Sequence, residues 1–417
     1  MLEGNVTKPV FTWDPNLGAS REQQALAGLH GLIHRFPNLD LPVLLLTPPL
    51  KTTWLENTAL ESLLYARIDP VVAQGTHEAF FQLQRADGLF PCMLGADQPD
   101  QPAIGKGFGQ IQQNVPLART AWELAQLMGK EDFLDRAYAA CGRFDDWIRT
   151  FRDTRKTGLV EMFCTYDMGQ DNSPRCTHIG MPGGCPDNDA ANCPRYENLP
   201  VLAPDLSAVV FGGRRALAAM ATALGKTAEA TMWTERAESL RHLIIKHCQD
   251  PDDGFFYDVD PRGRHLHFRG SQLFPLVQEH VLTQAEFEPL WCRYLGNPHE
   301  FWTPYPFASY SVSDPYFERK LPGNSWGGPA NCNLGLRTLL WMEHYGRQSE
   351  LKTLMQRWVS IHLRHPGFIW QVNPWTGDPS VNYGDLGFFT NNLPMGNFSV
   401  CYLAYLEFTR RLGLIAP

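Results

Sequence analysis

Residues 205–224 read DLSAVVFGGRRALAAMATAL, residues 228–247 read AEATMWTERAESLRHLIIKH, and this pair of segments decides the fold. In both segments apolar residues recur every three or four positions, which is the spacing of a helix that buries one face. Two helices joined by so short a connection pack as antiparallel neighbours. The pair therefore predicts a helical hairpin.

The same periodicity recurs along most of the chain, whereas strand patterns are few. The strand patterns occur at 254–258 and 367–372, each bounded by turn residues. Short-linked helix pairs with almost no strands predict an all-α fold built from hairpins. The other helical segments are 113–128, 132–151, 329–345, 348–363 and 397–412.

Long segments rich in Gly, Pro, Trp and Asn separate the helix pairs. Long loops in a compact domain are usually functional, so we expect these segments to meet at one end of a toroid and form the site there. No low-complexity linker divides the chain, and we therefore predict a single domain over residues 1–417. The long segments are 88–112, 164–204, 295–328 and 364–396.

The composition excludes several classes of partner. Of the 417 residues 44% are hydrophobic and 19% are charged, with a net charge of -8, which is typical of a large globular core. No basic run favours nucleic acid or an anionic membrane, and no apolar run has the length of a transmembrane helix. The first residues show no signal-peptide pattern, so a cytoplasmic location is the default expectation. Aromatic residues reach 12%, with 12 Trp, and flat apolar faces suit sugar binding.

The ten cysteines contain no CxxC pair. Three of them, Cys176, Cys185 and Cys193, share a loop with His178, but their spacing matches no standard zinc finger. A loop zinc site is the less favoured interpretation. We expect no metal and no organic cofactor.

The segment Gly169-Gln170-Asp171-Asn172-Ser173-Pro174-Arg175 concentrates chemistry in one turn. Cleavage of a glycoside needs a carboxylic acid that protonates the leaving oxygen and hydrogen-bonding groups that hold the ring. A neighbouring Arg would lower the pKa of Asp171, so an acid role requires burial or a second carboxylate. The alternative is an ordinary Asx turn that closes a loop.

This segment resembles the acid motif of glycoside hydrolase family 63, which includes bacterial mannosylglycerate and glucosylglycerate hydrolases and is related to the family 37 trehalases. Further landmarks of that family follow in the same order along the chain. They are Thr53-Trp54-Leu55-Glu56-Asn57, Asp87-Gly88-Leu89-Phe90-Pro91, Gln113 to Glu123, Asp205-Leu206, Asn324 to Asn333 and Asn373-Pro374-Trp375-Thr376-Gly377.

The resemblance implies an (α/α)6 barrel that acts with inversion on α-linked sugars. It implies that Asp171 is the general acid and that Trp54, Glu56 and Asn57 line the sugar subsite. Gln113, Arg175, Asp205, Trp326 and Asn333 are then supporting residues of the site.

Other interpretations of these residues stay open. Trp54 and Trp326 are alternatively core aromatics, Arg175 a structural salt bridge, and Asp205 a helix N-cap. Trp302 is either a second sugar platform or a loop anchor.

The resemblance fails at the base. The family has Glu before the NPxTG turn, whereas this chain has Trp370 and Gln371, and neither side chain deprotonates water. An inverting hydrolase needs a carboxylate opposite the acid. Gln371 is then an exchanged Glu in an inactive variant, or another carboxylate serves, with Glu56, Asp378 and Asp385 as candidates. A third option is attack by phosphate.

The preferred function is therefore hydrolysis of a small α-linked glycoside or disaccharide, with a water held near residue 371. The alternatives are an inverting phosphorylase or other sugar-transforming enzyme, and a non-catalytic sugar-binding protein. The expected partner is a small carbohydrate, with no nucleic acid and no membrane.

Overall fold

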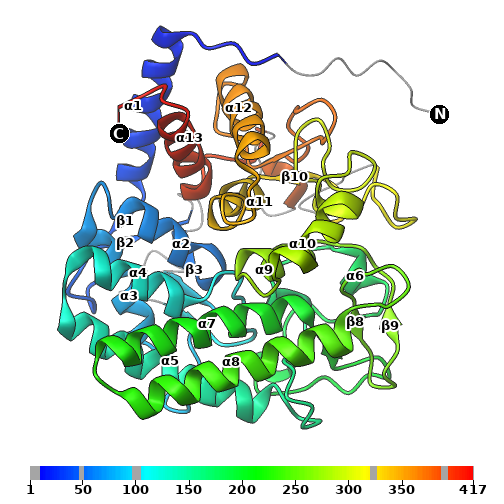
Figure 1. The fold of residues 1–417 in the computed structure, drawn as a ribbon. Coiled ribbons are helices and arrows are strands. Elements are labelled where there is room, and N and C mark those ends of the chain that lie inside the picture. The colour runs from blue at the N-terminus through cyan, green and yellow to red at the C-terminus, as the bar shows by residue number, and fades with distance from the viewer. Residues whose placement is uncertain (1–9, 47–50, 96–104, 320–325, 387–392, 417) are drawn as a thin grey trace.

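The computed structural model describes residues 10–46, 51–95, 105–319, 326–386 and 393–416. In these ranges the helices form an (α/α)6 barrel of six inner and six outer helices (Figure 1). The inner helices are α2 (Leu55–Tyr65), α4 (Leu117–Met128), α7 (Pro204–Ala223), α9 (Leu273–Gln278), α11 (Cys332–Arg337) and α13 (Ser399–Arg411). The outer helices are α3 (Pro70–Gln82), α5 (Glu131–Phe151), α8 (Thr227–Cys248), α10 (Gln284–Leu290), α12 (Gln348–Arg364) and α1 (Pro15–Gly31).

The two rings differ in how much of each helix they bury. Residues 55–62 of α2 are all buried, as are all six residues of α9 and of α11. Helices α5, α8 and α12 bury one face and expose charged residues on the other, which is the pattern of helices that cover a core. The closing pair joins the chain ends, because α1 packs on α13 (Figure 1).

The predicted hairpin of 205–247 is confirmed as α7 and α8, which lie side by side (Figure 1). The predicted helix 329–345 is wrong in its length, because α11 tightens at Thr338 into a 3-10 turn (Thr338–Leu340). Close packing requires a glycine within α11, since a Cβ on Gly335 would lie only 2.8 Å from Nε1 of Trp358. Helix α4 begins four residues later than predicted, because Pro116 occupies its N-cap.

Short strands order the long loops. Of the predicted strand 254–258, only Asp258 belongs to a strand of the structure, β8. Of the predicted strand 367–372, only Gln371 and Val372 do, as β11. The antiparallel sheets are β1 (Ile33–His34) with β2 (Val43–Leu44); β3 (Thr52–Trp54), β4 (Met93–Gly95) and β5 (Gly105–Gly107); β6 (Glu161–Met162), β7 (Val201–Leu202), β8 (Asp258–Val259) and β9 (His265–Leu266); and β10 (Ala330–Asn331) with β11 (Gln371–Val372).

Short turns complete the described chain. In the part of the protein that the structure describes, no helix has the length and apolar character needed to cross a membrane. The motif positions Asn324 and Ser325 lie outside the described residues. The remaining short elements are the helix α6 (Pro174–Thr177), the 3-10 helices Thr165–Asp167, Pro186–Asn188 and Tyr383–Leu386, and the π-helix Trp291–Leu295.

Candidate active site

Asp171 lies in a sharply folded loop that leads into α6. Gly169 and Asn172 have φ angles of 61° and 54°, so the backbone turns on both sides of Asp171. The carbonyl oxygen of Asp171 accepts a hydrogen bond from the N–H of Trp326 at 2.9 Å. The two predicted site residues Asp171 and Trp326 are therefore neighbours, and Asp171 stays half-buried while Trp326 is buried.

A buried carboxylate anchors this loop from behind. Asp167 accepts hydrogen bonds from the backbone N–H of Ile111 at 2.9 Å and of Phe163 at 2.9 Å, and it pairs with Arg152. Burial alone would raise the pKa of Asp167, but Arg152 and the N–H groups outweigh burial and lower it. The backbone N–H of Gln113 donates to the carbonyl oxygen of Asp167 at 3.2 Å, so Gln113 supports the loop.

Arg175 lies at the centre of a buried ion-pair cluster. Its guanidinium donates to Asp205 at 2.9 Å and to Asp258 at 2.5 and 2.6 Å, and it also donates to Gln170 at 3.3 Å. All of these side chains are buried. Arg175 thus forms buried ion pairs with two carboxylates, and Asp205 is not a helix cap, because Ala203 occupies the N-cap of α7.

Glu56 is the buried carboxyl group next to the acid loop. It lies in the first turn of α2, and a Cβ on Gly169 would overlap its Oε2. Burial raises the pKa of Glu56 to about 8, Arg337 opposes this shift, and the charge of Asp171 adds to it. Glu56 and Asp171 thus interact electrostatically. Glu56 also accepts a hydrogen bond at its Oε2 from Nε2 of Gln112, at 3.3 Å.

Arg337 links α2 to α11. Its Nη2 donates to Oδ1 of Asn57 at 2.5 Å and lies 3.7 Å from Oε1 of Glu56. Deeper in α2, burial raises the pKa of Glu61 to about 7 despite a hydrogen bond from Ser399. The sequence had not indicated Gln112, Arg337 or Glu61 as residues of the site. The only signal for the first two was their closeness in sequence to the predicted residues Gln113 and Asn333.

Trp370 and Gln371, which stand where the family has its general base, form a segment that lies beside the motif around Asn333. This segment is called the base segment below. Strand β11 pairs with β10, so Gln371 stands opposite Asn331, and the indole N–H of Trp370 donates to Oδ1 of Asn333 at 3.4 Å. The amide nitrogens of Asn331 and Asn333 are buried and have no hydrogen-bond partner among the described residues.

Two tryptophans have different surroundings. Trp54 is half-buried at the start of α2, and its indole N–H donates to Oγ1 of Thr52 at 2.9 Å. Trp302 lies in another aromatic cluster, 5.1 Å from Phe307 and 5.7 Å from Trp291 between ring centroids. It also lines a groove of about 600 Å³ beside α12. The structure therefore does not bring Trp302 together with the other predicted residues.

Three carboxylates are candidates for the general base, a role that Gln371 cannot fill. Asp378 is exposed beside Arg364, with 3.9 Å between their charged atoms, and Asp385 is exposed and accepts from the N–H of Asn382. Glu318, which the sequence had not indicated, is half-buried and packs against Gly327, the residue after Trp326.

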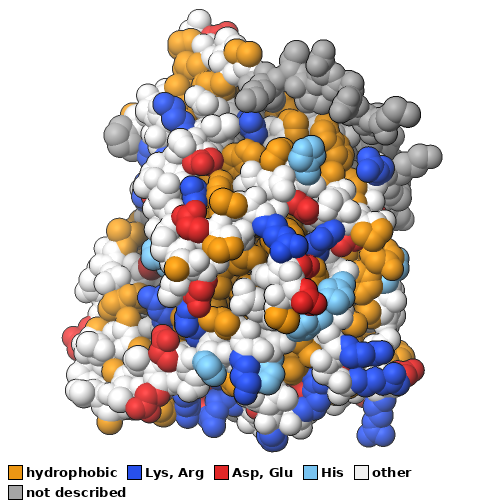
Figure 2. Space-filling view, turned by 45° about the vertical axis from the view of Figure 1, so that its right-hand side comes forward, with side chains coloured by type: hydrophobic (Ala, Val, Ile, Leu, Met, Phe, Trp, Pro, Cys, Tyr) orange, Lys and Arg blue, Asp and Glu red, His pale blue; other side chains and the backbone are white. Residues whose placement is uncertain are grey.

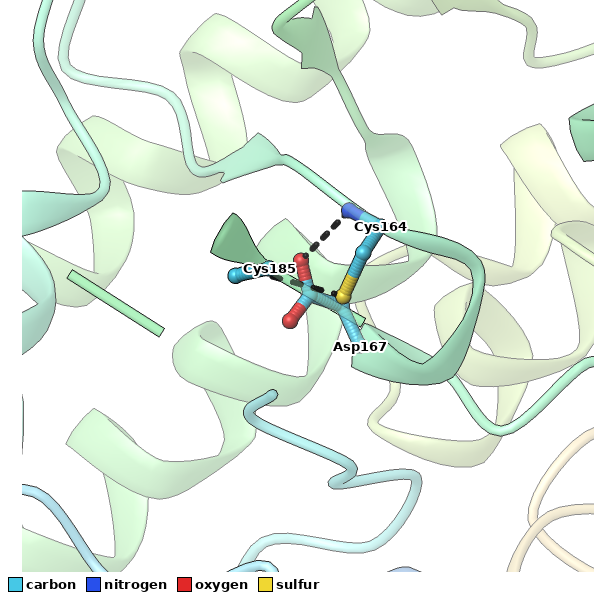
Figure 3. Close-up of side chains that lie close together, drawn as sticks. All are labelled: Cys164, Asp167 and Cys185. Atoms are coloured by element: carbon cyan, nitrogen blue, oxygen red, sulfur yellow. Dashed lines mark hydrogen bonds between the residues drawn. The ribbon is translucent and has the colours of Figure 1, made fainter. Parts of the chain in front are cut away.

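The loop residues Cys176, Cys185, Cys193 and His178 do not lie together as a zinc site, which was the less favoured interpretation of the sequence. Cys185 instead lies beside Cys164, with 3.5 Å between the sulfur atoms, and near Asp167 (Figure 3). Arg152 already donates to both Asp167 oxygens and to the sulfur of Cys185. The guanidinium thus supplies the positive charge that a metal ion would otherwise bring.

The chain matches the family model of the mannosylglycerate hydrolase MGH1-like glycoside hydrolase domain over residues 51–389. No curated protein sequence matches the chain. The match spans the predicted acid motif, the Glu56 segment and both sides of the β10–β11 pair.

Solved structures share the fold. A GH63 mannosylglycerate hydrolase from Thermus thermophilus, in complex with Tris and D-glycerate, is 18% identical with a TM-score of 0.71, over 94% of this chain and 100% of that chain. An uncharacterized conserved protein from the same organism is 19% identical with a TM-score of 0.69, over 94% and 100%. Neutral trehalase from Saccharomyces cerevisiae is 13% identical with a TM-score of 0.62, over 92% and 76%. At these identities the likeness shows the fold alone.

Proposed function

The chain belongs to the mannosylglycerate hydrolase MGH1-like glycoside hydrolases, and from this premise we propose that it hydrolyses a small α-linked glycoside with inversion, with Asp171 as the proton donor. The proposed catalytic unit is the single domain 1–417. Trp54, Glu56, Asn57, Trp326, Asn333 and Trp370 are proposed to surround the sugar.

The observation that carries the proposal is the interaction between Glu56 and Asp171. A general acid must hold a proton at neutral pH, and two interacting carboxyl groups titrate as a pair. Because burial and the charge of Asp171 raise the pKa of Glu56 to about 8, the pair keeps one proton at neutral pH. Arg337 only partly opposes the shift of Glu56, and Arg175, which follows Asp171 in the sequence, is engaged by Asp205 and Asp258.

We assign delivery of the proton to Asp171 rather than to Glu56. Asp171 is half-buried at the turn of its loop, whereas Glu56 is buried beneath Gly169. A substrate therefore has better access to Asp171. Glu56 supplies the second carboxyl group that retains the proton on the pair.

Glu318 is the proposed base. Its side chain packs against Gly327, and the adjoining Phe317 ring lies 5.6 Å from Trp375 in the turn that follows Gln371. The Glu318 segment thus lies between the acid side of the site and the base segment. Asp378 and Asp385 are exposed, and Glu56 lies on the side of the acid loop, which leaves these three less suited to activate water on the opposite face.

The proposed substrates are disaccharides and glycosyl-glycerates. The Thermus hydrolase with this fold was crystallised with D-glycerate. In this chain Arg337 and the amide groups of Asn331 and Asn333 offer several buried donors for hydroxyl and carboxylate oxygens.

The test is product formation from α-linked disaccharides, mannosylglycerate and glucosylglycerate, with and without phosphate. The proteins are the wild type, Asp171→Asn, Glu318→Gln and Gln371→Glu, with Asp385→Asn as an exposed isosteric control. We expect phosphate-independent turnover that Asp171→Asn and Glu318→Gln each reduce by about 10²-fold or more. Asp385→Asn should retain full activity.

Each other outcome has a defined meaning. Turnover that requires phosphate replaces the hydrolase with a phosphorylase. Activity only in Gln371→Glu shows that residue 371 is the base position and rejects Glu318. Sugar binding without turnover in every variant rejects the enzyme and favours a binding protein.

A further inference from the structure

A second group of polar side chains lies away from the acid loop, where α8 ends and the β8–β9 hairpin begins. Asp250 follows α8, and His265 begins β9 and His267 directly follows its last residue, so both imidazoles fall on one side of the strand. Oδ2 of Asp250 lies 3.1 Å from Nδ1 of His265 and 2.9 Å from Nε2 of His267. All three possible ligand atoms lie within 4.8 Å of one another.

Hydrogen bonds from the surroundings hold two of these three ligand atoms in place, those of His265 and Asp250. Nε2 of His265 donates to the carbonyl oxygen of His247 at 2.9 Å, which directs Nδ1 toward Asp250. Oδ1 of Asp250 accepts from the N–H groups of Asp252 and Asp253, which leaves Oδ2 to face the histidines. A histidine whose second nitrogen donates to a carbonyl, beside a hydrogen-bonded carboxylate, is the arrangement that orients metal ligands in proteins.

The contact between Asp250 and His265 needs a positive charge. Because Nε2 of His265 carries a proton, Nδ1 of the neutral ring has a lone pair, and this lone pair faces the Oδ2 lone pair only 3.1 Å away. Two acceptors at this distance repel each other. Either a second proton on His265 or a cation bound between the groups relieves the repulsion.

The site also has the access and charge that a cation requires. His267 is the exposed member, with 63% of its side chain accessible, whereas Asp250 is buried. Asp252 and Asp253 follow in sequence and add negative charge. Figure 2 shows histidine, arginine and acidic side chains gathered on the face over the β8–β9 end.

We infer that Asp250, His265 and His267 bind one divalent transition-metal ion of the zinc type. Two imidazole nitrogens and one carboxylate oxygen are ligands that zinc prefers, and solvent at the exposed side supplies the fourth position. His267 binds through Nε2 as its Nδ1–H tautomer. The ion joins the end of α8 to the hairpin whose Asp258 pairs with Arg175, so we assign it a structural role.

The test is calorimetric titration of the chelator-treated full-length protein with Zn²⁺ alone, together with the visible spectrum of the Co²⁺-loaded protein. The variants are His267→Ala and Asp250→Asn. His242→Ala, an exposed histidine on the same helix α8, is the matched control. Thermal melting of each protein verifies folding.

We expect one zinc ion per chain in the wild type and in His242→Ala, and a rise in melting temperature with zinc. Each triad variant should bind at least about tenfold more weakly. If His267→Ala and Asp250→Asn bind zinc as tightly as the wild type, the ion belongs to thiols such as the exposed Cys292. That result overturns the inference, as does the absence of saturable binding in the wild type.

Discussion

The carboxyl group of Glu56 lies directly against the backbone of Gly169, so that residue 169 has no room for a side chain. This contact joins the first turn of α2 to the loop of Asp171 and brings the two interacting carboxyl groups together.

Replacing Gly169 with alanine should displace Glu56 and reduce activity. The new Cβ would overlap the carboxylate, and the φ of 61° adds a backbone cost of about 1–2 kcal/mol. Gly180 is the matched control, because its φ is 72° but no atom lies within 4 Å of a Cβ there. Gly180→Ala should therefore show the backbone cost alone. Equal kcat/KM for the two variants would mean that the Glu56–Gly169 contact does not matter.

The raised pKa of Glu56 should make the folded protein less stable as the pH increases. A carboxyl group with pKa 4.5 when unfolded and about 8 when folded favours folding only while it is protonated. Between pH 4.5 and about 8, this group should lower the free energy of unfolding by about 1.4 kcal/mol per pH unit. Denaturant unfolding at pH 5, 6, 7 and 8 should give a steeper decline for the wild type than for Glu56→Gln, because Glu61 titrates in both proteins. Parallel curves would contradict the shift.

The pH dependence of activity should report the same carboxyl pair. Activity needs the shared proton, so kcat/KM should fall as the pH rises through about 8 in the wild type. Glu56→Gln removes the group that holds the shared proton up to about pH 8, so the alkaline limb should move to lower pH. A limb that stays in place would show that Glu56 does not influence the acid.

The ion pairs of Arg175 should be worth far more than a surface pair. Arg175→Met leaves Asp205 and Asp258 as unpaired buried charges, which costs about 3–5 kcal/mol of unfolding free energy. Arg262, whose pair with Glu197 is exposed, is the control and should change stability by at most about 1 kcal/mol. Similar losses in both variants would place Arg175 outside the core.

Trp370 and Trp302 should behave differently in catalysis. Trp370 donates to Asn333 beside Gln371, so Trp370→Ala should lower kcat/KM by about tenfold or more. Trp302 packs between Trp291 and Phe307, so Trp302→Ala should lower the melting temperature with little change in kcat/KM. A large loss of activity in Trp302→Ala at unchanged stability would restore the second sugar platform.

The helical segments of this chain were readable from its sequence because helix formation is largely local. The 3.6-residue period of 205–224 and 228–247 appears in the structure as α7 and α8. The family landmarks identified the (α/α)6 barrel, and the motif Gly169 to Arg175 identified the loop of the candidate acid Asp171. The length of α11 was not readable, since the apolar period of 329–345 continues through the 3-10 turn at Thr338–Leu340.

The sequence by itself determined the barrel, the family and the position of the candidate acid. Only the tertiary structure decided that Glu56 is the group that interacts with Asp171, that Arg175 is held by Asp205 and Asp258, and that Trp302 lies elsewhere. The physical reason is that pKa values and ion pairs depend on burial and on charges a few ångströms away. Those neighbours come from α2, α7, α11 and β8, which are distant along the chain and meet only when the barrel closes.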